Sequence, residues 1–97
     1  MLEGLSAETF EGRAGERFGA EFEPGATTEL ELVEVSRLPA SGIGRADPFS
    51  LVFRAPRGAQ HEQRIYRLEH DELGTFELFL VPIQPDDRGP LYQAVFA

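Results

Sequence analysis

Cysteine, lysine, asparagine and tryptophan are all absent from the 97 residues of this chain. Without cysteine there is no disulfide framework, no catalytic thiolate and no cysteine-ligated zinc. No apolar run approaches the roughly 18 residues of a membrane span, and residues 1–8 lack the basic and apolar regions of a signal peptide. We therefore expect a cytoplasmic protein that does not enter a membrane.

Positive charge is also scarce. The chain has nine arginines and 17 acidic residues, so the formal net charge is −8 and the pI is near 4.6. A field of this sign repels phosphate backbones, and we expect no nucleic-acid partner. The exception is the segment 36–67, in which six arginines outnumber Asp47 and Glu62.

The length and composition bound the architecture. A chain of this size forms about one domain with one modest core. Its hydrophobic fraction of 41% and charged fraction of 27% are typical of globular proteins and not of disordered ones. We predict that residues 1–97 form a single β domain.

One helix start is well marked. Ser6 is a good N-cap, and Leu5 and Phe10 occupy the positions of a hydrophobic staple. Gly12 soon interrupts the pattern. The sequence predicts a short helix over residues 7–13.

From residue 16 onward, apolar residues recur with a period of two, as in half-buried strands. The adjacent apolar residues Leu32 and Val33 mark a change of phase, which predicts a β-bulge. A turn is predicted at 85–90. The pattern indicates an all-β fold, a six-stranded and mainly antiparallel small barrel or sandwich with one short N-terminal helix. The expected strands are 16–23, 27–38, 48–54, 64–70, 75–83 and 91–96.

The expected strand 75–83 is apolar on both faces. One face carries phenylalanine and leucine at positions 76, 78 and 80. Both faces must be covered, either by the short helix or by another subunit. The residues of the second face form the predicted interface, and they are Phe79, Val81 and Ile83.

Titratable residues crowd together at Glu69-His70-Asp71-Glu72. Two interpretations are open: a zinc or iron site in which His70 and His61 converge with a carboxylate, or a bend between two strands. Neighbours in a strand point to opposite faces and cannot jointly bind a metal. Gly74 supplies the positive φ on which hairpin loops end, so we predict a bend.

Four arginines flank the predicted loop 55–63. They form either a site for a phosphate, sulfate or carboxylate ligand, or a set of cross-strand ion pairs with Glu29, Glu31 and Glu34. We favour ion pairing, because charges on strand surfaces are usually solvated or weakly paired. The four residues are Arg54, Arg57, Arg64 and Arg67.

Catalytic motifs are not apparent in the sequence. Asp86 and Asp87 lie between prolines and lack the ligand spacing of a calcium loop. The serines have no nucleophile-elbow context, and Ser41-Gly42-Ile43-Gly44 lacks the glycine and lysine of a P-loop. We predict a protein that is not an enzyme and that uses no cofactor and no metal.

Several segments together resemble a known family. They are LSAETFEGRAGERF at 5–18, PFSLVF at 48–53, YRLEHDELGTFELFLVPI at 66–83 and YQAVF at 92–96. They are similar to a family of short, uncharacterised bacterial proteins classed as a domain of unknown function. The resemblance implies genomic surroundings that contain phage tail-collar or tail-fibre-like proteins, and it supplies no catalytic residues.

These observations favour a non-enzymatic structural or protein-interaction subunit, or accessory factor, of a bacterial, phage-tail-like assembly. It would bind a protein partner or form a homo-oligomer. The alternative is a β-barrel that binds a small anionic or apolar ligand, either in its interior or at the arginine group.

Overall fold

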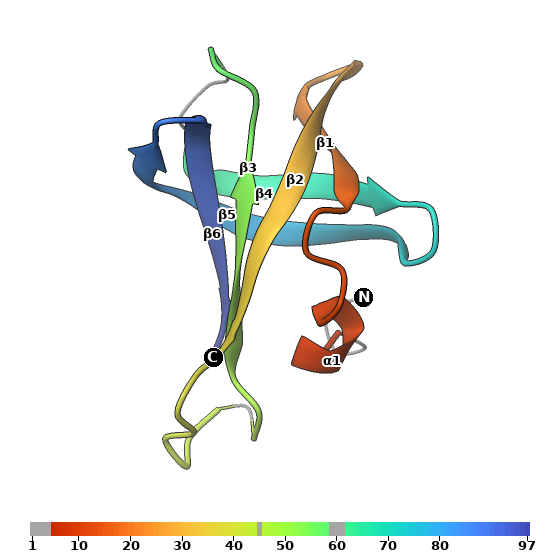
Figure 1. The fold of residues 1–97 in the computed structure, drawn as a ribbon. Coiled ribbons are helices and arrows are strands. Elements are labelled where there is room, and N and C mark those ends of the chain that lie inside the picture. Colours follow the sequence, from red (N-terminus) through yellow and green to blue (C-terminus); the bar gives the residue numbers. More distant parts are fainter. Residues whose placement is uncertain (1–4, 45, 59–61) are drawn as a thin grey trace.

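The computed structural model describes residues 5–44, 46–58 and 62–97. Its elements, in chain order, are α1 (Ala7–Phe10), β1 (Arg17–Glu23), β2 (Ala26–Arg37), β3 (Phe49–Arg54), β4 (Arg64–His70), β5 (Gly74–Asp86) and β6 (Gly89–Phe96). The strands are antiparallel to their neighbours and close into a barrel in the order β1-β2-β3-β6-β5-β4 (Figure 1). The predicted all-β fold is confirmed, and of its two forms the barrel is correct.

The period of two in the sequence sets the inside and outside of this barrel. In β1, Phe18, Ala20 and Phe22 are buried, while Glu21 is exposed and Gly19 is half-buried. The predicted bulge is confirmed as well, since the register of β2 against β3 shifts between Leu32 and Glu34. The bulge lets one long strand keep an apolar side toward the core as the barrel wall curves.

One strand, β5, serves two walls. Its first half pairs with β4 over Gly74–Leu80, and its second half pairs with β6 from Val81 onward. In Figure 1, β4 and β5 cross β2, β3 and β6 at a steep angle. The predicted turn 85–90 proves shorter, because Asp86 already pairs with Gly89 across a two-residue turn.

Helix α1 closes one end of the barrel. The ring of Phe10 is fully buried, and it contacts four other phenylalanine rings with centroid separations of 6.1 to 6.5 Å. The helix is shorter than the predicted span 7–13, because Glu11 is already extended and Gly12 has a φ of +83°. Within the described residues, no helix has the length and apolar character needed to cross a membrane.

The barrel closes along a narrow seam between β1 and β4. Only Gly19 pairs with Glu69 and Ala20 with Leu68 there, whereas the other neighbouring strands share longer ladders. Side chains bridge the two strands beyond the ends of this seam. The surface over the seam is therefore the place where backbone pairing is weakest and where grooves form.

Candidate functional site

His70 closes the turn between β4 and β5. Its Nδ1 accepts hydrogen bonds from the backbone N–H groups of Glu72 and Leu73, at 3.1 and 3.2 Å. The proton of the neutral ring is therefore on Nε2, which lies 2.8 Å from Oε1 of Glu16. Both ring nitrogens have partners within the protein, and the lone pair of Nδ1 already accepts from the turn, so none is left for a metal ion in this arrangement.

The predicted bend at residues 69–72 is confirmed. The chain turns at 71–73, and Gly74 has a φ of +83°. The His70 side chain is only 7% exposed, and its ring centroid lies 4.6 Å from that of Phe18. His61, the second histidine of the metal alternative, lies outside the described residues.

A network of four side chains, here called the latch, joins the segment before β1 to the β4–β5 turn. Nη1 of Arg13 donates to Glu16 at 3.2 Å and to Glu72 at 2.6 Å, while Glu16 also meets His70. The hydrogen bond from His70 is the main reason that the pKa of Glu16 lies below its ordinary value. Desolvation opposes this shift, and Arg13 adds to it. The ion pairs and hydrogen bonds of the latch thus connect the segment before β1 to the end of β4 and its turn, at one end of the seam, where the two strands no longer pair through their backbones.

The latch predicts a pH-dependent loss of stability. Because the pKa of Glu16 is lower in the folded protein, its contribution is present above the ordinary value of 4.5 and disappears as the pH falls through the folded value. Glu16→Gln should therefore be less stable than the wild type at pH 7, and the difference should shrink toward about pH 3 in urea unfolding. Glu23→Gln is the control, since this carboxylate forms no ion pair with any described residue. An equal wild-type advantage at both pH values would contradict the latch.

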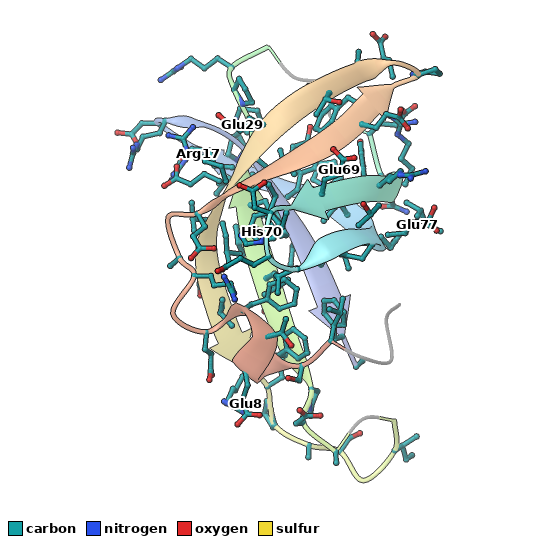
Figure 2. The ribbon with its side chains drawn as sticks, turned by 90° about the vertical axis from the view of Figure 1, so that its right-hand side faces the viewer. Glu8, Arg17, Glu29, Glu69, His70 and Glu77 are labelled. Carbon is teal, nitrogen blue, oxygen red and sulfur yellow. The ribbon has the colours of Figure 1, made fainter. Side chains whose placement is uncertain are left out.

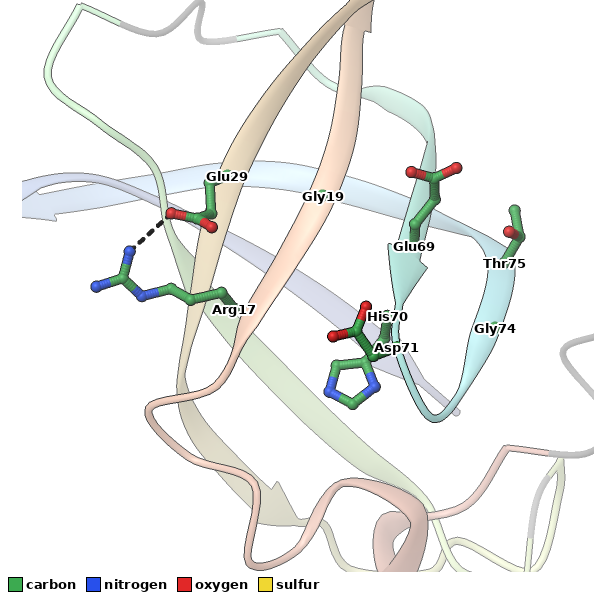
Figure 3. Close-up of a pocket in the computed structure, with 8 residues that line it drawn as sticks. All are labelled: Arg17, Gly19, Glu29, Glu69, His70, Asp71, Gly74 and Thr75. Atoms are coloured by element: carbon green, nitrogen blue, oxygen red, sulfur yellow. Dashed lines mark hydrogen bonds and ion pairs between the residues drawn. The ribbon is translucent and has the colours of Figure 1, made fainter.

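A groove of about 460 Å³ lies over the outside of the seam (Figure 3). Gly19 lines this groove, and a Cβ at this position would stand 3.2 Å from Cγ2 of Thr27 and 3.7 Å from Oε1 of Glu69. A second groove of about 250 Å³ shares Gly19 and Glu69 with the first. The first groove is lined by Arg17, Gly19, Glu29, Glu69, His70, Asp71, Gly74 and Thr75.

The charges of this groove are mainly negative. Arg17 is engaged by Glu29 at 2.8 Å, as the dashed line in Figure 3 marks. The carboxylates of Glu69 and Asp71 form no ion pair with any described residue. No cluster of three or more metal-ligating side chains occurs in the part of the chain that the structure describes. The groove can accept a cationic side chain, and its chemistry is unsuited to an anionic ligand.

Two of the four arginines lie at the β5–β6 turn. Arg54 donates to Asp86 at 2.5 Å and to Glu31 at 3.3 Å, and Arg57 donates to the backbone carbonyl of Asp87. The guanidinium of Arg54 keeps the pKa of the Asp86 carboxyl below its usual value. Glu31 is one of the acidic partners expected from the sequence, so the Arg54 contacts agree with the ion-pair interpretation.

The other two arginines lie on β4. Arg64 donates to the backbone carbonyl of Phe22, its guanidinium stands 4.6 Å from the ring centroid of Tyr66, and it thus bridges the seam beyond the end of backbone pairing. Arg67 is exposed and lies directly opposite Glu77 of β5. The structure therefore divides the arginine group between two places, and it gives Arg54, Arg57 and Arg64 acceptors within the protein.

The predicted interface lies on the outside of the barrel wall. Phe79 is 51% exposed, while Val81 and Ile83 are half-buried. Helix α1 does not cover this face, because Phe10 packs against Phe76 on the inner face of the same strand. Of the two faces of this strand, the helix thus packs against the one that carries Phe76, and it leaves Phe79 uncovered.

Ile65 is the residue of this face that sequence reasoning missed. It is 62% exposed and pairs directly with Phe79 across β4 and β5. The signal was available in the period of two, which places Ile65 on the face opposite to Tyr66. Two large apolar side chains therefore stand side by side in solvent on the outer wall.

Comparisons with known proteins give one match. A family model described as Domain of unknown function (DUF6916) matches residues 5–96. This match confirms the resemblance to a domain of unknown function. No curated protein and no solved structure matches the chain.

Proposed function

Because the chain belongs to the family described as Domain of unknown function (DUF6916), which carries no assigned activity, we propose its function from its surface: it is a non-enzymatic protein-interaction domain. In this proposal it serves as a structural subunit or accessory factor of a bacterial assembly. The phage-tail-like character of that assembly rests on the sequence resemblance alone. The observation that carries the proposal is the exposed pair of Ile65 and Phe79.

The interior of the barrel is filled by side chains, which favours a role for the outer surface. Phe10 fills one end, and the rings of Phe22, Tyr66 and Tyr92 meet at another part of the core with centroid separations of 4.9 to 6.1 Å. Tyr92 is so well shielded that desolvation raises its pKa to about 12. Side chains thus occupy the space that a ligand-binding barrel would keep open. The described grooves lie on the outside.

The arrangement of titratable groups also favours a non-enzymatic role. A general base must reach a substrate proton, yet both nitrogens of His70 are held by Glu16 and the β4–β5 turn. Arg54 is held by its carboxylate partners. These groups stabilise the barrel wall. The exposed pair of Ile65 and Phe79 remains accessible, and it suits a contact surface.

A large exposed aromatic residue paired with a large aliphatic one is costly to keep in water. Burying a phenylalanine or isoleucine side chain releases about 1.5–3 kcal/mol. Phenylalanine is also among the residues enriched in the centres of protein interfaces. A partner that covers Ile65 and Phe79 would gain this free energy, and the barrel itself supplies no cover.

Site-specific photo-crosslinking tests the proposal. A photoreactive phenylalanine analogue at position 79, in the protein produced in its native cells, is expected to give one defined crosslinked product whose second chain mass spectrometry identifies. The matched control places the same analogue at Ile43, which is 85% exposed in a loop and should give no defined product. Equal and diffuse crosslinking from both positions would contradict a docking role for the outer wall.

A further inference from the structure

The outward side chains of β4 and β5 form three cross-strand rows. One row is apolar, the next pairs a basic with an acidic residue, and the third pairs a carboxylate with a hydroxyl group. In Figure 2, Glu69 and Glu77 lie on these two strands, whose outer side chains point away from the barrel core. The rows are Ile65 with Phe79, Arg67 with Glu77, and Glu69 with Thr75, and these six residues are here called the outer β4–β5 face.

The charged row is left without partners inside the chain. Arg67 and Glu77 stand opposite each other and are exposed, but the side chain of neither forms an ion pair or a hydrogen bond with any described residue. Arg13, Arg17 and Arg54, by contrast, each hold a carboxylate within 3.3 Å. The outer β4–β5 face therefore presents one free basic group and one free acidic group beside its apolar pair.

We propose that the outer β4–β5 face docks on the same face of a second copy of this chain. The inference rests on the proposed function and names its partner. In the proposed dimer, a two-fold axis lies in the interface, parallel to the strands and midway between β4 and β5. This rotation places β4 of each copy over β5 of the other, as an isologous contact requires.

The two-fold arrangement makes every row complementary to itself. Ile65 lies over Phe79 of the second copy, Arg67 over Glu77, and the carboxylate of Glu69 over the hydroxyl of Thr75. Each contact occurs twice. Two chains of formal net charge −8 repel each other, so opposite charges at the contact matter for which faces meet. A second copy supplies both charges in register without any further partner.

Charge exchange at the middle row tests this geometry. Arg67→Glu alone or Glu77→Arg alone places like charges in both contacts between identical chains, and each variant should dimerise at least about tenfold more weakly than the wild type. An equimolar mixture should recover the dimer, because the Arg67→Glu chain then presents two acidic groups to two basic groups of the Glu77→Arg chain. Sedimentation velocity at micromolar concentrations measures all three samples.

Recovery in the mixture is specific for contacts between chains. Each single variant also places like charges across β4 and β5 within its own chain, and mixing leaves that repulsion unchanged. The double variant Arg67→Glu/Glu77→Arg restores opposite charges both within and between chains, so it should fold and dimerise like the wild type. It should not form mixed dimers with the wild type, which native mass spectrometry of isotope-labelled chains can show.

Exchange of the exposed Arg17–Glu29 pair is the matched control, and Arg17→Glu and Glu29→Arg should leave the dimer unchanged. A monomeric wild type, or mixed dimers between wild type and double variant at the statistical ratio, would overturn the second-copy inference. If position 79 then crosslinks to a different protein, the proposed function survives without it. If the chain is monomeric and position 79 gives no defined product, both fail.

Discussion

Replacing Phe10 by alanine is expected to lower the free energy of unfolding by about 3–5 kcal/mol, the usual cost of removing a buried phenylalanine. Phe10 is fully buried, and its ring meets those of Phe18, Phe49, Phe76 and Phe96. These rings come from four strands. The loss would take a large part of the roughly 5–15 kcal/mol that stabilises a domain.

The effect should be large although α1 has only four residues. Such a short helix gains little from its own hydrogen bonds, and it is held by the side chain that it inserts into the barrel end. Urea unfolding followed by circular dichroism measures the change. Glu8→Ala is the control, because Glu8 lies on the same helix and is exposed, and it should change stability by less than about 0.5 kcal/mol. Similar values for both variants would mean that α1 does not close the core.

Replacing Gly89 by alanine should cost about 2–6 kcal/mol, for two separate reasons. Gly89 has a φ of +146°, a conformation that costs other residues roughly 1–3 kcal/mol. A Cβ at this position would also stand 2.8 Å from the backbone oxygen of Ala55, and such overpacking costs roughly 1–3 kcal/mol. The backbone oxygen of Ala55 cannot rotate away from the new Cβ, as the end of a flexible side chain could.

Gly74→Ala separates the two costs. Gly74 has a φ of +83°, but a Cβ there would have no neighbour within 4 Å, so only the conformational cost of about 1–2 kcal/mol should appear. Thermal and urea unfolding of both variants measures the difference. The close approach of β6 to the end of β3, where the N–H of Ala55 donates to the carbonyl of Pro90 at 3.0 Å, predicts that Gly89→Ala is the worse variant. A larger loss for Gly74→Ala would refute that order.

The strands themselves were predictable because their signal is local. Residues two apart in a strand share a face, so Phe18, Ala20 and Phe22 identify the inner side of β1 without knowledge of its neighbours. The bulge near Leu32 and the turn before Gly74 are likewise predicted by residues that are adjacent in the sequence. The helix length and the turn at 85–90 were predicted less well, because backbone conformation at Glu11 and the pairing of Asp86 decide them.

For the candidate site, the type of contact was predictable from the sequence, but most of the partners were not. The sequence indicated that arginines would pair with glutamates, and Arg54 does pair with Glu31. It did not indicate that Asp86 is the nearer partner of Arg54. Such contacts join residues far apart in the chain, and they follow from which strands lie side by side.

The residues alone indicate an acidic, cysteine-free β protein, the inward and outward positions of its strands and the turn that follows His70. Two contacts could be seen only in the folded barrel: His70 meets Glu16, which lies 54 residues away, and Ile65 stands beside Phe79 on an uncovered wall. The physical reason is the range of each signal. Side-chain alternation acts between neighbours in one strand, whereas strand order and register depend on how the whole barrel packs its core.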